Sequence, residues 1–482
     1  MTQQLTPMSA TPDPDLDSNR VRVGAAGQLR PPAYDRDALA PAVVHIGFGS
    51  FHRAHQAVYF DDLARSGCAD WGVVGVGVRR PELGRVLEAQ GNLFTVVQRD
   101  GLVSSARVVG CVVEYLLLAD RPGDVVQRLA DPRAKLVTLT ITADGYDTRS
   151  VECAAIFGAL AAALAGRRAA GVAPFTVLSC DNTPDPQAAR RATLWAAQRR
   201  DPALAEWVER HVRFPVSMVD RITPQTSLDE RDRIALEFDV LDRWPVLTEP
   251  FAQWVIEDAF CNDRPPLDSV GVRFVDDVAP YKLIKTRMLN GVHTAVAYLG
   301  YLAGARRTNQ AMADIALRRF ANVLMRDEIA PALPGDVRGM RLKGYRKQVL
   351  IRLANPEIGD ELARLCARGS RKMPDYVLPS LHSARAERRR APLCTLAVAA
   401  WIRYLGGTDL DGRPIQIDDP LLDELQPLAR GGATGIRTLL SRDELFGGLG
   451  ADAEFVEAVQ RYVELIDLRG VRTAISFATD GG

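Results

Sequence analysis

The sequence predicts an α/β fold in which a doubly wound, mostly parallel sheet is followed by a mainly α-helical domain. Three observations support this class. Short β-rich runs alternate with helical stretches from about residue 40 to 280, as they do in a parallel sheet covered by helices. After about residue 285 the helical period continues with almost no β-rich runs. A chain of 482 residues with 47% hydrophobic content can also form two or three domains with large cores.

Residues 1–39 form the first predicted part, a flexible tail. They are polar and rich in proline near their start, and they carry neither a helical nor a strand period. They contain no hydrophobic stretch of the kind found in a secretory signal, and the chain has no apolar run of 18 residues. The seven cysteines are scattered singly, as is usual in a reducing compartment. We therefore expect a cytoplasmic protein with no membrane partner.

Residues 40–284 are predicted to form a dinucleotide-binding domain. Their β-rich runs are nearly all apolar, as strands buried on both faces of a parallel sheet are. These runs are residues 42–46, 71–78, 93–98, 134–142 and 174–180. Residues 285–482 are predicted to form a mainly helical substrate domain, with the active site in the cleft between the two domains.

The charge balance gives no reason to expect a nucleic-acid partner. Sixty basic residues offset sixty acidic ones, so the net charge is zero. The two histidines of the stretch HRAH, His52 and His55, lack the carboxylate partner of a common zinc motif, and no CxxC pair is present. We therefore expect a small-molecule ligand and no metal.

A glycine turn follows the first predicted strand. In the stretch GFGSFHR, Gly47 allows a tight reversal and Gly49 allows a pyrophosphate to approach the backbone where a helix begins. His52 stands where the usual third glycine would be, so an ordinary glycine-rich turn is the alternative. Its position between a strand and a helix favours a Rossmann-type coenzyme site, with Phe51 and Arg53 as further candidate contacts.

The second predicted strand ends near the residue expected to bind the coenzyme ribose. Glu82 is the available carboxylate there, and it would suit the ribose hydroxyls of NAD. Arg79 and Arg80 stand beside it and could instead receive the 2′-phosphate of NADP. The residues themselves leave NAD and NADP both open.

The segment YKLIKTRMLNGVH contains the polar side chains that are best suited to catalysis. If residues 282–299 form one helix that advances about 100° per residue, its polar side chains share an arc beside the apolar stripe. These side chains are Lys282, Lys285, Thr286, Asn290 and His293. An arc beside an apolar stripe suits the edge of a cleft, but a partly solvated helix face explains it equally well. Helical geometry alone does not decide which lysine is reactive.

Six sequence blocks resemble the polyol-specific long-chain dehydrogenases, the mannitol dehydrogenase family. They follow one another along the chain in the order that is typical of the family. The segment KTRMLNGVH has the spacing K-x4-N-x2-H, and the other blocks are VVHIGFGSFHRAHQAVYFDDL, LSCDN, MVDRITP, EPFAQWVIED and GSRKMP. The likeness runs from about residue 42 to 470. It implies a metal-independent enzyme that moves a hydride between NAD or NADP and a sugar polyol or sugar acid.

The resemblance also implies roles for individual residues. Lys285 corresponds to the general acid/base, Asn182 and Asn290 to amide donors that hold the reacting oxygen, and His293 to a residue that orients the substrate. The further residues expected to bind the substrate are Asp220, Arg364 and Lys372. We expect the protein to be a monomer or a small homo-oligomer.

Two positions depart from the family pattern. Lys282 and Ala143 stand where the family usually has glutamate. A lysine at position 282 would suit an anionic substrate, so three hypotheses follow. The first is a polyol dehydrogenase that interconverts D-mannitol and D-fructose, which the helical-domain blocks resemble most. The second is a hexuronate reductase acting on fructuronate or tagaturonate, and the third is a dinucleotide-binding protein without redox turnover.

Overall fold

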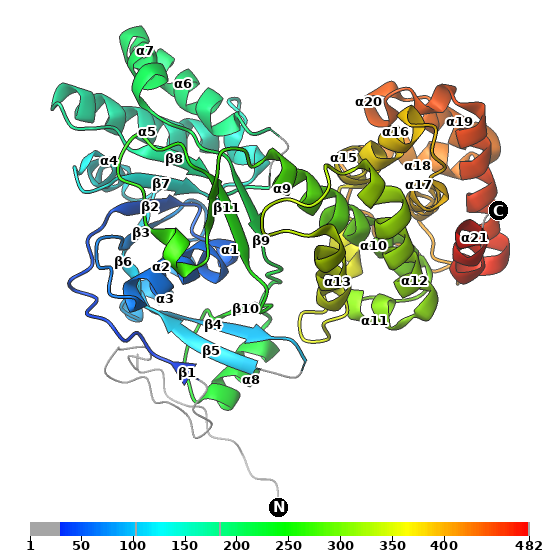
Figure 1. Cartoon of the computed structure of the whole chain (residues 1–482), viewed down its shortest axis with the longest axis horizontal. Coiled ribbons are helices and arrows are strands. Elements are labelled where there is room, and N and C mark those ends of the chain that lie inside the picture. Colours follow the sequence, from blue (N-terminus) through cyan, green and yellow to red (C-terminus); the bar gives the residue numbers. More distant parts are fainter. Residues whose placement is uncertain (1–28, 102–103, 183–184, 481–482) are drawn as a thin grey trace, which may run out of the picture. The chain divides into compact units, whose positions relative to one another are not determined.

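The computed structural model describes residues 29–101, 104–182 and 185–480 (Figure 1). The chain divides into two compact units, Met1–Asp276 and Asp277–Gly482. We call them the Rossmann unit and the helical unit. Lys285 belongs to the helical unit by this division, as do Asn290 and His293.

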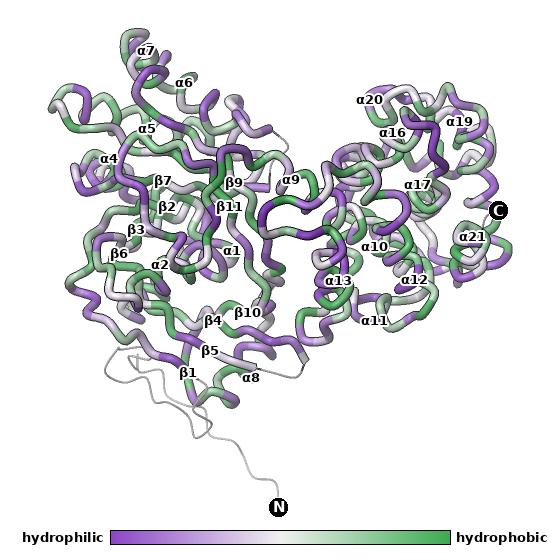
Figure 2. Tube along the Cα trace, viewed as in Figure 1, coloured by the Kyte–Doolittle hydropathy of each residue, from purple (hydrophilic) through white to green (hydrophobic). Residues whose placement is uncertain are grey.

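A five-stranded parallel sheet forms the centre of the Rossmann unit, with strand order β6-β3-β2-β7-β8. Its strands are β2 (Val43–Ile46), β3 (Val73–Gly77), β6 (Val112–Leu117), β7 (Leu136–Leu139) and β8 (Thr176–Ser179). Side chains that alternate along β2 enter two different cores: Val44 packs with residues of α4 (Pro122–Ala130) and α5 (Val151–Ala169), and Val43 with residues of α2 (Gln56–Arg65) and α3 (Pro81–Ala89). The strands are accordingly hydrophobic along most of their length (Figure 2). The predicted doubly wound fold is confirmed.

One predicted strand belongs to a different sheet. The run at 93–98 does form a strand, β4 (Phe94–Arg99), but not within the parallel sheet as we expected. It lies in a four-stranded sheet of order β1-β5-β4-β10, antiparallel to β5 (Ser104–Val109) and parallel to β10 (Val246–Thr248). The physical reason is that a short apolar run shows that a strand is buried but not which strand it pairs with.

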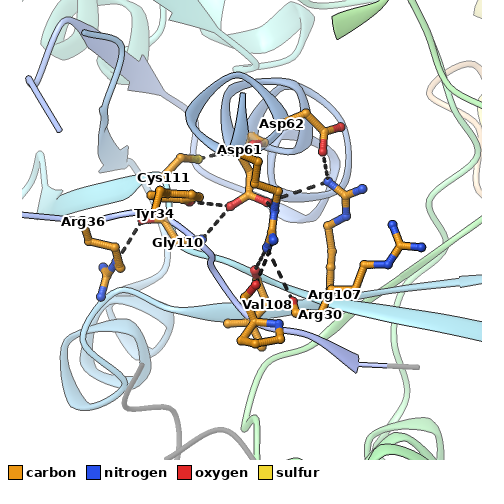
Figure 3. Close-up of polar contacts among 12 residues, drawn as sticks. Arg30, Tyr34, Arg36, Asp61, Asp62, Arg107, Val108, Gly110 and Cys111 are labelled. Atoms are coloured by element: carbon orange, nitrogen blue, oxygen red, sulfur yellow. Dashed lines mark hydrogen bonds and ion pairs between the residues drawn. The ribbon is translucent and has the colours of Figure 1, made fainter. Parts of the chain in front are cut away.

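The four-stranded sheet begins in the region predicted to be a tail. Residues 1–28 of that region lie outside the described part of the chain, and β1 (Leu29–Arg30) pairs with β5. Hydrogen bonds fix the residues that follow: the Tyr34 hydroxyl donates to Asp61 at 2.5 Å and Arg36 donates to the Gly110 carbonyl at 2.9 Å (Figure 3). Arg65 also donates to the Pro31 carbonyl at 2.8 Å. Residues from 29 onward are therefore part of the folded unit.

A third sheet and several helices complete the Rossmann unit. The sheet has the strand order β12-β11-β9. Its strands are β9 (Ser217–Asp220), β11 (Gln253–Glu257) and β12 (Arg273–Val275). The remaining α-helices of this unit are α1 (Ser50–Ala54), α6 (Ala188–Arg200), α7 (Pro202–His211) and α8 (Leu228–Phe238).

The helical unit is built around α17 (Pro392–Leu405), of which all but two residues are buried. It packs against α10 (Val292–Leu302) and the long α21 (Ala453–Thr479). The other helices are α9 (Ala279–Lys285), α11 (Thr308–Ala313), α12 (Ile315–Val323), α13 (Leu342–Leu353), α14 (Leu362–Cys366), α15 (Gly369–Lys372), α16 (Leu378–Ala386), α18 (Leu422–Arg430), α19 (Gly432–Leu440) and α20 (Asp443–Phe446).

Three π-helical segments interrupt these helices, and one of them corrects the prediction for residues 282–299. Instead of one regular helix, α9 leads into a π-helix, Thr286–Gly291, before α10 begins. The others are Leu324–Ile329 and Met373–Val377. The first and third pack together, and a Cβ on Gly291 would lie 2.7 Å from the Tyr376 carbonyl oxygen. Because a π-turn places an extra residue in the helix, the polar arc expected from a 100° advance does not persist through this segment.

Candidate active site

In the Rossmann unit, the candidate residues follow the carboxyl ends of three adjacent strands. The glycine turn follows β2, the stretch TITADGY follows β7, and Asp181 and Asn182 follow β8. Because β2 pairs with β7 and β7 with β8 in parallel register, these three segments lie at one edge of the sheet. This edge is where open α/β sheets bind their ligands.

Gly47 adopts a conformation that requires glycine. Its φ is +96°, and a Cβ there would overlap the Thr140 carbonyl oxygen. Gly49 has an ordinary extended backbone, and the only neighbour of a Cβ there would be the Gly47 carbonyl oxygen at 3.6 Å. The turn is therefore tight at Gly47 and open at Gly49, as the approach of a pyrophosphate to the backbone requires.

The buried His45 stabilises this turn through a chain of hydrogen bonds. Thr140 donates its hydroxyl proton to the Gly47 carbonyl oxygen at 2.9 Å, so its oxygen accepts from His45 Nε2 at 3.0 Å. His45 Nδ1 then accepts from the Thr138 hydroxyl at 2.8 Å. Burial lowers the pKa of His45 to about 3, which keeps the ring neutral in this chain of hydrogen bonds. This role could not be predicted from the sequence, because His45 lies within an otherwise apolar strand.

Phe51 and Arg53 follow the turn but lie in different surroundings. Phe51 is half-buried and stacks on His55, with ring centroids 5.2 Å apart. Arg53 is fully buried; it donates to the Trp244 carbonyl at 2.5 Å and lies 5.4 Å from the Phe94 ring centroid. This guanidinium therefore lies between β4 and the residues that precede β10, with Nε and Nη2 lacking a hydrogen-bond partner within the described part of the chain. Its contact with coenzyme phosphates stays a prediction.

Glu82 is the predicted ribose-binding carboxylate, and this role stays a prediction. It is exposed in the first turn of α3, which follows β3, the neighbour of β2 in the sheet. Arg79 forms an ion pair with Glu152, whereas Arg80 is exposed beside Glu82. One of the two arginines considered for a 2′-phosphate is thus engaged within the protein.

Asp181, which was not singled out from the sequence, ties a candidate residue to the neighbouring loop. Its carboxylate accepts hydrogen bonds from the backbone N–H groups of Ile141 and Thr142, at 3.0 and 2.8 Å, and from the Tyr146 hydroxyl at 2.7 Å. Removal from water raises the pKa of Asp181, and these donors oppose the rise. The loop after β7 is thereby tied to the residue that precedes Asn182. The sequence signal that could have identified Asp181 is its position at a strand end, next to the candidate Asn182.

Thr142 carries backbone strain in this loop, with φ +64°. Such a conformation is costly for a β-branched residue and often occurs at functional sites. Ala143 and Asp144, which follow it, are both exposed. Asn182 is exposed at the end of the neighbouring segment. Asp220 lies elsewhere in the unit, buried as the last residue of β9 in the three-stranded sheet.

In the helical unit, Lys285 and Lys282 differ in burial. Lys285 is the last residue of α9 and is 7% exposed, whereas Lys282 one turn earlier is half-buried. Lys285 lies where the π-helical segment begins. The structure therefore distinguishes two lysines that the helical arc alone could not.

Asn290 and His293 each have a buried nitrogen atom without a hydrogen-bond partner. These atoms are Asn290 Nδ2 and His293 Nε2. Buried polar atoms are nearly always satisfied in native proteins, and leaving one unsatisfied costs about 1–3 kcal/mol. Burial lowers the pKa of His293 to about 4, although Asp360 opposes the shift, so the ring is neutral at physiological pH. Both nitrogens are suited to a ligand oxygen.

Arg364 and Lys372 both act on the pKa of His293, and their predicted contact with a substrate stays a prediction. Arg364 forms an ion pair with the buried Asp360, with Nε–Oδ1 at 2.9 Å. Lys372 donates to the Leu365 carbonyl at 2.8 Å, and burial, reinforced by Arg364, lowers its pKa to about 8. Asp360 was missed, although its spacing of four residues from Arg364 was an available signal.

Among the described residues, no group of three or more histidine, cysteine, aspartate or glutamate side chains could hold a metal ion. His52 stacks on His45 with ring centroids 3.4 Å apart, and His55 contacts the Gln253 carbonyl oxygen at 3.0 Å. In the same part of the chain, no helix has both the length and the apolar character needed to cross a membrane.

Comparison with known proteins identifies relatives of both units. The family model described as the mannitol dehydrogenase Rossmann domain matches residues 41–269, and that of the mannitol dehydrogenase C-terminal domain matches residues 277–467. A mannitol 2-dehydrogenase of Emericella nidulans is 39% identical, over 92% of this chain and 94% of its own length. Mannitol dehydrogenase 2 of Saccharomyces cerevisiae is 37% identical, over 93% of this chain and 94% of its own.

Two solved structures share the fold over almost the whole chain. One is a ternary complex of Pseudomonas fluorescens mannitol 2-dehydrogenase with NAD and D-mannitol. It is 35% identical with a TM-score of 0.86, and the match covers 97% of this chain and all of that one. The other, a D-sorbitol dehydrogenase in substrate-free form, is 30% identical with a TM-score of 0.88, and the match covers 96% of this chain and all of that one.

Proposed function

Because this chain belongs to the mannitol dehydrogenase family, we propose that it is an NAD-dependent polyol dehydrogenase that interconverts D-mannitol and D-fructose. The observation that carries the proposal is that Asn290 Nδ2 and His293 Nε2 are buried without a hydrogen-bond partner among the residues that the structure describes, in the segment that follows the buried Lys285. A polyol offers several hydroxyl oxygens to such groups. The names of the solved and curated relatives support the same substrate class.

The glycine turn supports NAD as the coenzyme. Gly47 provides the reversal and Gly49 leaves the backbone open to a pyrophosphate. The exposed Glu82 would bind the ribose hydroxyls. When bound, NAD accepts or supplies the hydride. A carboxylate at this place favours NAD over NADP, since it would repel a 2′-phosphate.

Lys285 acts as the general acid/base in this mechanism. During oxidation, neutral Lys285 accepts the proton of the substrate hydroxyl group, and the hydride leaves the carbon atom that bears this group. Asn182 and Asn290 donate amide hydrogen bonds to the oxygen as negative charge develops on it. During reduction, protonated Lys285 returns the proton. His293 orients a neighbouring hydroxyl, and Asp220, Arg364 and Lys372 bind the rest of the substrate.

A second candidate substrate is a hexuronate. The observation that favours it is the presence of several cations near His293: besides burial, Arg364, Lys372 and Arg352 lower the pKa of this histidine, and Asp360 opposes them. A carboxylated sugar would find charge-assisted partners there. Lys282 would add a further cation at the start of the segment.

Purified protein should be assayed with D-fructose and with fructuronate, each with NADH and with NADPH. We expect turnover with fructose and NADH, and a loss of about 10²- to 10⁴-fold in kcat for Lys285→Ala. The matched control is Lys343→Ala, which removes an exposed lysine of α13 and should leave kcat unchanged. Turnover of fructuronate but not of fructose would show that the substrate is a hexuronate and not a polyol. Equal rates in wild type and Lys285→Ala would refute the assigned base.

A further inference from the structure

A cavity of about 490 Å³ lies in the helical unit and is lined by none of the residues assigned above to coenzyme or polyol. It is formed by the end of α16, the loop before α17 and one face of α21. Five of its lining residues are arginines: Arg385, Arg388, Arg389, Arg390 and Arg461. Its volume is typical of sites for small organic ligands.

The charge of this arginine pocket is only partly balanced by the protein. Glu454 and Glu457 are the acidic residues of its lining. Arg385 pairs with Asp452, and Arg389 Nε donates to Glu387 at 2.7 Å. Arg385 also lies 4.0 Å from Glu454, so five arginines face four carboxylates in a partly enclosed space. The remaining positive charge attracts an anionic ligand more strongly there than on an open surface.

Arg389 provides the second observation. Its terminal nitrogens, Nη1 and Nη2, are both buried and have no hydrogen-bond partner. An arginine side chain offers five N–H donors in a planar fork, and the terminal pair matches two oxygens of a phosphate or carboxylate group. Burying these donors without an acceptor is costly. A ligand with at least two anionic oxygens would satisfy them.

The start of α17 does not compete for this ligand. Its first free N–H groups, those of Leu393 and Cys394, already donate to the buried carboxylate of Glu328, at 2.7 and 2.8 Å. The binding capacity therefore lies in the guanidinium groups. The lining also has apolar residues, among them Leu381, Pro392 and Phe477, which would contact the organic part of a ligand.

We propose that the arginine pocket binds a small organic phosphate, a phosphate monoester of about the size of a sugar. The dianionic phosphate lies against Arg389 and Arg461, and the organic part lies against the apolar wall. A phosphate offers these arginines three acceptor oxygens, one more than a single carboxylate does. The site is separate from the proposed polyol chemistry and does not depend on it.

The test is calorimetric titration of the full chain with glucose 6-phosphate and, separately, with inorganic phosphate. We expect saturable binding of glucose 6-phosphate that is tighter than that of inorganic phosphate. Arg389→Gln and Arg461→Gln should each weaken it by at least about tenfold, which corresponds to ~1.4 kcal/mol. Arg461 is exposed on α21, so its replacement tests binding without disturbing the core.

The matched control is Arg437→Gln, which removes an exposed arginine of α19 outside the pocket lining. Unchanged affinity in this control, together with loss in the two pocket variants, supports the site. No saturable binding by the wild type, or equal weakening in all three variants, would overturn it. Equal affinity for the two phosphates would overturn the organic part of the assignment. Polyol oxidation measured on the same proteins separates this result from the proposed enzymatic function.

Discussion

The two units of the molecule position their candidate residues by different irregularities of the backbone. In the Rossmann unit the irregular residues lie in loops at strand ends, where Gly47 and Thr142 have φ of +96° and +64°. In the helical unit they lie within helices, as π-helical segments next to Lys285 and Lys372. Parallel strands bring their ends to one edge without distortion. A helix has no such edge, so its hydrogen-bond ladder itself must be altered to redirect a side chain.

The largest expected effect is that of Gly47→Ala, which tests the strand-end loop. The new Cβ would overlap a backbone carbonyl, and the φ of +96° disfavours alanine. We expect the Rossmann unit to lose more than about 4 kcal/mol of stability, or to fail to fold. Urea unfolding measures this change. Gly49→Ala is the matched control, because its Cβ would have room and should leave the unfolding midpoint nearly unchanged. Equal midpoints for both variants would contradict the geometry of the turn.

The second effect concerns Glu328, which lies in the π-helical segment Leu324–Ile329. Burial raises its pKa from 4.5 to about 7, so between these values the folded chain binds more protons than the unfolded chain. The stabilisation from this group is fully present below pH 4.5 and is lost as the pH rises through about 7. The complete loss amounts to about 3 kcal/mol.

Glu328→Gln removes this pH-dependent contribution to the free energy of unfolding, because glutamine cannot ionise. The stability of the variant relative to the wild type should rise across the same pH range, whatever the constant cost of the changed hydrogen bonds to α17. Hydrogen exchange of α17 amides, measured at several pH values in both proteins, provides the readout. Parallel pH profiles for the two proteins would show that Glu328 keeps an ordinary pKa.

The smallest effect is expected for Gly291→Ala, the counterpart of Gly47→Ala in the helical unit. The added Cβ would lie 2.7 Å from the Tyr376 carbonyl oxygen, but the φ of Gly291 is an ordinary helical −61°. We expect a loss of about 2 kcal/mol. Because Asn290 and His293 flank this glycine, kcat should also fall about 10- to 100-fold while the KM for NADH is unchanged.

Gly344→Ala is the control for that variant. Gly344 is exposed within α13, and the nearest neighbour of its added Cβ would be 4.0 Å away. The substitution should stabilise the chain by about 0.5–1 kcal/mol. If Gly291→Ala also stabilised the chain, the contact between the two π-helical segments would not constrain this region.

The fold class could be predicted from sequence, and the pairing of individual elements could not. Alternation of strands and helices is a local pattern, and it gave the doubly wound sheet correctly. The run at 93–98 joined another sheet because pairing depends on distant residues such as those of β10. Residues 29–36 carry no periodic pattern, yet hydrogen bonds to Asp61, Arg65 and Gly110 fix them.

The candidate site shows the same division. The polar residues of the segment from Lys282 to His293 could be identified, and the π-turn inside it could not, because packing against Tyr376 from a distant part of the sequence accompanies that turn. Asp181 and Asp360 were missed for a similar reason. Each acts on residues that the chain brings close only after folding: Thr142 and Tyr146 in one case, Arg364 and His293 in the other.

The packing around Gly369 also gives the helical unit a spectroscopic reporter. Gly369 begins α15, the helix that ends at Lys372, and a Cβ there would overlap the indole nitrogen of Trp401 on α17. Trp401 is the one tryptophan of the helical unit; the others are Trp71, Trp195, Trp207, Trp244 and Trp254. Replacing those five with phenylalanine would leave a single indole whose emission responds to small displacements of the segment that carries Lys372. Ligand-induced movement there could then be followed optically, without an added dye.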